Sequence, residues 1–268
     1  MHDRKGESGM LRLEGKVALV TGATGGIGEA IAKRFGNEGA NVMLVGRSPE
    51  KLKATLARLE GQGKFAEFVA DATDEEATAG SVAATVKAFG GLDILVANAG
   101  TEGRVNPIES QSATDFEDVL RTNVVGVWLA MKHSVEPMKE RGGGSMIAMA
   151  SVAGLLGTAG MSPYVASKHA VYGLVKSAAL ELGESNIRVN AVAPGPIDNR
   201  MMQSLADQFA PEDPGTARGG IEGLVALKRY GTNEEVANLT LFLASGEASY
   251  SSGGMFTVDG ALTAGHLL

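Results

Sequence analysis

The stretch T-G-A-T-G-G-I-G at Thr21–Gly28 decides the fold, because it joins an apolar run at Val17–Val20 to a helical pattern near residues 26–38. Apolar runs and helical patterns alternate along the rest of the chain. The other runs that we expect to form strands are Val42–Val45, Phe65–Val69, Ile94–Ala97, Met146–Ala150, Val189–Val192 and Met255–Val258. The other expected helices lie near residues 49–60, 74–89, 112–140, 163–183 and 233–245. This alternation predicts an α/β protein whose doubly wound parallel sheet has about seven strands, covered by helices on both faces.

The glycines of this stretch predict a nucleotide site. Gly22 permits a tight turn, while Gly26 and Gly28 let the backbone and the helix approach a pyrophosphate closely. The amides and the dipole at the start of the helix favour negative charge. No Gly-Lys-Ser/Thr follows, which argues against a nucleotide-triphosphatase loop. A glycine-rich turn without any ligand is the alternative.

Composition restricts the class of protein. The chain has 268 residues, a net charge of −7 and no cysteine, which excludes disulfides, thiolate metal sites and a cysteine nucleophile. The acidic balance argues against a nucleic-acid surface, and no apolar stretch is long enough to suggest a membrane span. The four histidines show no metal-ligand spacing, so we expect no metal site. These features are compatible with a cytoplasmic protein.

The chain reads as one domain over residues 11–268, after a polar segment at 1–10 that we expect to be disordered. Residues 198–231 break the alternating pattern with methionines, prolines and a group of glycines. Because this segment follows the carboxyl end of an expected strand, where open α/β sheets bind ligands, we interpret it as a substrate loop or lid. A disordered surface loop is the alternative.

Tyr164 and Lys168 stand four residues apart in S-P-Y-V-A-S-K, and Ser151 lies upstream of them. Four residues of helix return to nearly the same face, so a phenol and an ammonium point into one pocket. An ammonium about 4 Å away would lower the phenol pKa from its free value of about 10. The pair therefore predicts a proton-transfer device. A tyrosine and a lysine also occur at this spacing by chance, so the prediction depends on the other motifs.

The end of the second expected strand bears on the choice of cofactor. An acidic residue there binds the ribose hydroxyls of NAD, but this chain has Gly46 followed by Arg47. A guanidinium pairs instead with the 2′-phosphate of NADP. The sequence thus favours NADP over NAD, with a solvated surface arginine as the alternative.

Together these motifs resemble the short-chain dehydrogenase/reductase family in its compact single-domain form, over about residues 11–264. The motifs that carry the resemblance are T-G-A-T-G-G-I-G at 21–28, D-A-T-D at 71–74, A-N-A-G at 97–100, Asn123 in R-T-N-V-V-G, Ser151 in S-V-A-G, Tyr164 with Lys168, and N-A-V-A-P-G at 190–195. The resemblance implies a Rossmann fold, hydride transfer between NAD(P) and a carbonyl or secondary alcohol, and a homotetramer.

The resemblance also implies catalytic roles. Tyr164 would be the general acid/base, and Ser151 would hold and polarise the substrate oxygen. Lys168 would bind the nicotinamide ribose and lower the tyrosine pKa. Asn123 would support a proton-relay water through a helix irregularity. These four residues form the expected catalytic set.

The same resemblance gives the expected cofactor contacts. Asp71 would contact the adenine, Asn98 through Gly100 would line the adenosine side, and Pro194 through Ile197 would flank the nicotinamide. The full set is Gly22, Ala23, Thr24, Gly26, Ile27, Gly28, Arg47, Asp71, Ala72, Asn98, Ala99, Gly100, Tyr164, Lys168, Pro194, Gly195 and Ile197.

Three positions depart from the family pattern. Gly25 stands where NADP-preferring members often carry a basic residue, Ala97 replaces one of two paired asparagines, and Asn199 replaces a threonine that helps to hold the nicotinamide amide. The first departure weakens the preference for NADP.

The substrate is expected to be a small carbonyl or alcohol compound of apolar or amphipathic character, because Met201, Met202 and Phe209 fall in the lid segment. The leading interpretation is a 3-oxoacyl-carrier-protein reductase-like enzyme, and a sugar, steroid or xenobiotic alcohol dehydrogenase is the close rival. A nucleotide-sensing protein without catalysis and a scaffold subunit are the alternatives from other classes. Trp128 lies on a helix face that packs either on another subunit or inside the core.

Overall fold

A single parallel sheet organises the molecule. The computed structural model describes residues 11–265, so the expectation for residues 1–10 lies outside the described part of the chain. Within that range seven parallel strands pair in the order β3-β2-β1-β4-β5-β6-β7. The strands are β1 (Val17–Thr21), β2 (Asn41–Gly46), β3 (Phe65–Val69), β4 (Ile94–Ala97), β5 (Gly144–Met149), β6 (Ile187–Pro194) and β7 (Met255–Val258). The chain winds outward from β1 to β3 and then returns to β4 beside β1, which confirms the doubly wound sheet.

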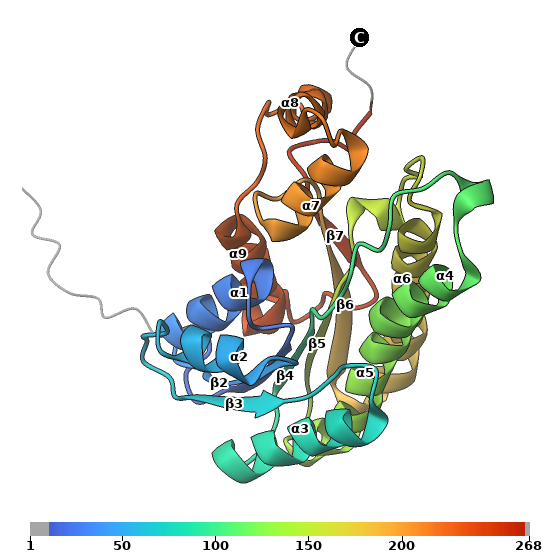
Figure 1. Cartoon of the computed structure of the whole chain (residues 1–268). Coiled ribbons are helices and arrows are strands. Elements are labelled where there is room, and N and C mark those ends of the chain that lie inside the picture. The colour runs from blue at the N-terminus through green and yellow to red at the C-terminus, as the bar shows by residue number, and fades with distance from the viewer. Residues whose placement is uncertain (1–10, 266–268) are drawn as a thin grey trace, which may run out of the picture.

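Helices cover both faces of this sheet (Figure 1). They are α1 (Gly26–Asn37), α2 (Pro49–Leu56), α3 (Glu75–Phe89), α4 (Ala113–Leu120), α5 (Gly126–Glu140), α6 (Ser162–Leu182), α7 (Arg200–Phe209), α8 (Pro214–Leu224) and α9 (Asn233–Ala244). One face packs against α1, α2 and α9, with Phe35 and Leu241 fully buried. The other packs against α3, α5 and α6, with Met138 and Val175 fully buried. The apolar face of each of these helices is thus buried against the sheet.

Local signals set the starts of several helices. Ser48 caps α2 by accepting a hydrogen bond from the Lys51 amide at 3.2 Å, with proline at the next position, as its sequence predicts. Thr232 and Glu235 form a reciprocal capping box at the start of α9. These caps satisfy amides that have no partner within the helix.

Two expectations need correction. The strand Phe65–Val69 was expected to be covered on both faces, but β3 is an edge strand whose residues are only part-buried, and Val69 is 48% exposed. The single helix expected near residues 112–140 is divided into α4 and α5 by a π-helical segment at Arg121–Val125. A π-helical segment adds a residue to the turn and rotates the side chains that follow it.

The segment 198–231 is ordered as α7 and α8, and both helices stand above the carboxyl edge of the sheet (Figure 1). The opposite edge is fixed by Asp93. Its buried carboxylate accepts hydrogen bonds from the Val17 amide at 2.9 Å and from the Arg141 guanidinium at 3.2 and 3.3 Å. This carboxylate therefore joins the starts of β1 and β4 to the end of α5.

Candidate active site

A cavity of about 1530 Å³ opens along the carboxyl ends of the strands. Its floor follows β1, β2, β4, β5 and β6 where each strand ends, and α7 and α8 form its upper wall. The wall residues from these two helices are mainly apolar: Met201, Met202, Leu205, Phe209, Ala217, Ile221 and Leu224. One cavity thus extends from the glycine turn to the region of Tyr164.

The glycine turn is held by close backbone packing. Gly22 has φ +64°, and a Cβ there would lie 2.9 Å from the Ala99 Cα. A Cβ on Gly28 would collide with the Gly22 carbonyl oxygen. The Asn98 side-chain amide donates to the carbonyls of Thr21 and Gly22, each at 3.1 Å. Asn98 therefore braces the turn, although it also lines the cavity.

Tyr164 and Ser151 meet at the far end of the cavity. Both residues line the cavity wall, and the Ser151 side chain acts on the Tyr164 phenol. Burial raises the pKa of Tyr164 to about 12; the Ser151 hydroxyl opposes this rise and the negative charge of Glu102 adds to it. The phenol therefore holds its proton at neutral pH.

Lys168 lies one helical turn beyond Tyr164 on α6 and is also buried. Its ammonium donates to the Met149 carbonyl at 2.7 Å and lies 5.5 Å from the centroid of the Tyr164 ring. Burial lowers the pKa of Lys168 to about 8. The sequence predicted that this ammonium lowers the pKa of Tyr164. That prediction is wrong for the protein alone, because burial dominates the pKa of the phenol.

Asn123 lies in the π-helical segment and is fully buried. It accepts from the Thr101 amide at 2.8 Å and donates to the Thr101 carbonyl at 2.9 Å. It also donates to the Ser167 hydroxyl at 3.0 Å, which in turn donates to the Tyr164 carbonyl at 2.7 Å. The expected helix irregularity is present, and Asn123 links it to α6.

Arg47 and Asp71 face each other across the other end of the cavity. The guanidinium and the carboxylate are 3.9 Å apart, and both side chains are largely open to solvent. Hydrogen bonds from Thr73 lower the pKa of Asp71, and the Arg47 charge adds to this effect. Arg47 is thus near the cavity but shares its charge with a neighbouring carboxylate.

Most of the residues predicted from the sequence line this cavity. They are Gly22, Thr24, Gly26, Ile27, Arg47, Asp71, Ala72, Asn98, Ala99, Gly100, Ser151, Tyr164, Lys168, Pro194, Gly195 and Ile197. Ala23 does not line the cavity: its side chain is fully buried in the core, and its amide donates to the Val45 carbonyl. Gly28 and Asn123 act behind the cavity wall.

Several residues of the wall were not predicted from the sequence, among them Thr101, Arg121, Thr122 and Arg200. Thr101 directly follows the A-N-A-G motif, and the position after a strand end was a usable signal for it. Arg200 had no such signal, since its neighbour across the cavity comes from a distant part of the chain. Asn199, noted only as a departure from the family pattern, caps α7 by accepting from the amides of Met201 and Met202.

Two absences concern the part of the chain that the structure describes. No helix there is long and apolar enough to cross a membrane. Among the same residues, no cluster of three or more histidine, aspartate or glutamate side chains is arranged to hold a metal ion.

Comparisons with known proteins agree with this geometry. A family model described as enoyl-(acyl carrier protein) reductase matches residues 22–263. The chain is 38% identical to levodione reductase of Leifsonia aquatica, with 95% of this chain and 97% of that protein covered. The crystal structure of levodione reductase superimposes with a TM-score of 0.93 at 37% identity, and covers 95% of this chain and 100% of that one.

Two further relatives carry different names. The 3-alpha-(or 20-beta)-hydroxysteroid dehydrogenase of Mycobacterium tuberculosis is 40% identical, over 95% of this chain and 92% of that protein. The 3-oxoacyl-acyl-carrier-protein reductase of Thermotoga maritima is 39% identical, over 94% of this chain and 99% of that protein. The chain therefore belongs to the short-chain dehydrogenase/reductase family and is an oxidoreductase that uses a nicotinamide dinucleotide to interconvert alcohol and carbonyl groups.

Proposed function

We propose that this enzyme reduces an apolar ketone to a secondary alcohol, and that the reaction is reversible. One observation carries the proposal: Ser151 and Tyr164 line the same cavity as the glycine turn, beneath the apolar wall of α7 and α8. A ketone placed against the hydroxyls of these two residues would have its oxygen on two donors and its carbon skeleton on apolar side chains.

The residues at the strand ends fit a dinucleotide. The backbone at Gly22 and Gly26 is bare of side chains, and the start of α1 offers its amides to a pyrophosphate. When bound, the nicotinamide supplies or accepts the hydride. We assign the adenosine side to Asp71 and to Asn98 through Gly100, and the nicotinamide side to Pro194 through Ile197. Lys168 would hold the nicotinamide ribose.

Tyr164 acts as the general acid in this proposal. Its raised pKa keeps the phenol protonated at neutral pH, which suits donation of a proton to the developing alkoxide. The Ser151 hydroxyl hydrogen-bonds the same oxygen and stabilises its charge. Asn123 would hold the π-helical segment in the shape that a proton-relay water needs.

A 3-oxoacyl thioester is our leading candidate substrate, and a steroid or xenobiotic ketone is the second. The relatives named above support both, and the apolar wall favours either over a sugar. For the cofactor we propose NADP, because Arg47 borders the adenosine end of the cavity. NAD is the alternative, since Asp71 already neutralises part of the Arg47 charge.

We further propose a cytoplasmic homotetramer in which residues 198–231 act as the substrate lid. An exposed apolar face supports the assembly: Trp128 on α5 is 46% exposed and Val125, one turn before it, is 41% exposed. The position of α7 and α8 over the cavity supports the lid.

Turnover of NADPH or NADH with a panel of ketones tests the proposal. Tyr164→Phe should reduce kcat by at least about a hundredfold, because it removes the proton donor, while leaving the Kd for the cofactor nearly unchanged. Full activity of this variant would show that Tyr164 is not the acid. Loss of cofactor affinity and activity together would instead indicate that the variant is misfolded.

A further inference from the structure

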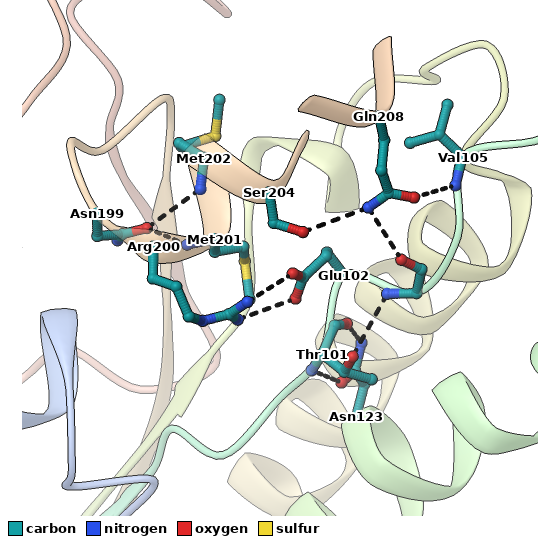
Figure 2. A network of polar contacts seen from close by, with 11 residues as sticks. Thr101, Glu102, Val105, Asn123, Asn199, Arg200, Met201, Met202, Ser204 and Gln208 are labelled. Atoms are coloured by element: carbon teal, nitrogen blue, oxygen red, sulfur yellow. Dashed lines mark hydrogen bonds and ion pairs between the residues drawn. The ribbon is translucent and has the colours of Figure 1, made fainter. Parts of the chain in front are cut away.

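A network of polar contacts joins α7 to the loop after β4, on the substrate side of the cavity (Figure 2). At its centre, two nitrogens of the Arg200 guanidinium donate to the two carboxylate oxygens of Glu102, at 2.9 and 3.2 Å. Glu102 is almost completely buried, with 7% of its side chain exposed, whereas Arg200 is 72% exposed and lines the cavity. A two-point arginine–carboxylate pair fixes both distance and orientation between its elements.

Gln208 supplies a second tie at the other end of α7. Its side-chain oxygen accepts from the Val105 amide at 2.9 Å, and its side-chain nitrogen faces the Gly103 carbonyl at 3.5 Å. The helix is thus attached to one loop at both ends, through residues about two turns apart. Rocking of α7 over the cavity would break both ties.

The same loop is attached to the helix that carries the phenol. Thr101, next to Glu102, is bound through both backbone groups to Asn123. Asn123 is bound to Ser167, which donates to the Tyr164 carbonyl. Two sets of polar contacts, joined by the peptide bond between Thr101 and Glu102, therefore connect the guanidinium on α7 to the backbone of Tyr164.

Apolar packing shows which side chains these polar contacts hold in place. Leu205 of α7 belongs to a buried cluster with Tyr164 and Met161, and Met202 packs against the same cluster. These side chains also line the cavity. The placement of α7 therefore sets the shape of the pocket directly beside the phenol.

We propose that Glu102 and Arg200 are positioning residues that hold α7 in register with Tyr164, so that the apolar side chains of α7 fit the body of a bulky ketone. This inference rests on the proposed function for its substrate and on the contacts alone for its mechanical part. The pair acts through α7, and the Glu102 charge also raises the pKa of Tyr164, but neither residue itself transfers a proton or a hydride. Nothing in the A-N-A-G motif that precedes Glu102 requires such a partner 98 residues away.

A cycle of single and double variants tests this positioning role. Arg200→Met leaves a buried carboxylate without its partner, which is more costly than losing the pair altogether. We expect its KM for a steroid ketone to rise about tenfold, with a smaller change for cyclohexanone and an unchanged Kd for the cofactor. Adding Glu102→Gln removes the unpaired charge but does not restore the contact between α7 and the loop, so the double variant should recover only part of this loss.

Two outcomes overturn the proposal. A KM for the steroid ketone that is unchanged in Arg200→Met would mean that α7 keeps its place without the pair, and equal KM changes for the two ketones would mean that the pair does not shape the pocket. Arg12→Met is the matched control, because Arg12 forms a similar two-point pair with Glu247, and neither residue lines the cavity. This control should leave both KM values unchanged.

Hydrogen exchange separates this proposal from the proposed function. In the full-length protein, the amides of α7 should exchange about tenfold faster in Arg200→Met than in the wild type or in Arg12→Met, and partial protection should return in the double variant. If the wild type reduces none of the ketones, the proposed function fails, but the exchange rates still test the link. Unchanged exchange in α7 would overturn the positioning role even in an active enzyme.

Discussion

At the scale of single residues, burial and the negative charge of Glu102 both raise the pKa of the proposed proton donor, Tyr164. Tyr164 and Lys168 occupy adjacent turns of α6, but the ammonium is bound to the Met149 carbonyl and not to the phenol. The buried phenol is therefore a proton donor in the protein alone, with its pKa raised to about 12. The same burial destabilises the charged form of Lys168, because the ammonium loses its hydration.

Lys168→Met should stabilise the protein in the absence of cofactor. The pKa of Lys168 falls from an ordinary 10.5 to about 8 on folding, so the unfolded chain binds more protons between these values. Stability therefore rises with pH across this window, and below it the buried ammonium costs on the order of 3 kcal/mol.

Chemical denaturation at several pH values checks this prediction. The variant should exceed the wild type in free energy of unfolding at pH 7, and the difference should shrink towards pH 10.5. Lys176→Met, at an exposed site on the same helix, is the control. A difference that grows with pH would contradict the proposed effect of burial.

Arg47→Ala should discriminate between the two cofactors. If the guanidinium holds a 2′-phosphate, its loss should weaken NADPH binding by about tenfold or more and NADH binding far less. Fluorescence titration of each cofactor measures both Kd values, and Lys53→Ala on the exposed side of α2 is the control. Equal losses for the two cofactors would refute a phosphate-binding role.

At the scale of elements, α8 is the weakest part of the cavity wall. Its eleven residues include four glycines, Gly215, Gly219, Gly220 and Gly223. Each glycine inside a helix costs up to about 1 kcal/mol relative to alanine, because it loses more backbone freedom on folding. The helix is therefore held mainly by its contacts, among them the pairing of Arg218 with Asp198 at 3.0 Å and its packing over the Tyr230 ring.

Gly219→Ala should stiffen this wall. A Cβ at Gly219 meets no atom within 4 Å, so alanine adds helix propensity without a clash. We expect the amides of α8 to exchange more slowly, corresponding to about 0.5–1 kcal/mol, as measured by hydrogen exchange. Gly173→Ala on α6 is equally free of contacts and should leave α8 unaffected. Unchanged exchange in Gly219→Ala would show that helix propensity does not limit the stability of α8.

At the scale of the whole molecule, the exposed face around Trp128 should determine assembly. In the proposed homotetramer, Trp128→Glu places a charge on that face and should shift the assembly to smaller species, as measured by light scattering during gel filtration. Trp128→Phe keeps the apolar character and should remain tetrameric. A wild type that is monomeric, or a Trp128→Glu variant that stays tetrameric, would remove this face from the interface.

Much of the fold was predictable because its signals are local. The alternation of apolar runs with capped helices indicated each strand, and the glycine turn, Tyr164 and Lys168 indicated where the cavity lies. The residues of the π-helical segment are compatible with an ordinary helix, so the irregularity at Asn123 followed only from the family resemblance and not from the local pattern. The pairing of Arg200 with Glu102 and the capture of Lys168 by a backbone carbonyl depend on tertiary placement, which no local pattern encodes.

The clamp at Asp93 has a consequence for how such an enzyme can diversify. Asp93 holds the edge of the sheet opposite the cavity, where β1 and β4 begin. None of its bonds involves residues 198–231. Substitutions in α7 and α8 therefore leave the bonds of Asp93 in place. A new substrate range can be acquired by exchanging one stretch of chain, while the bonds of Asp93 at the amino ends of the strands are kept.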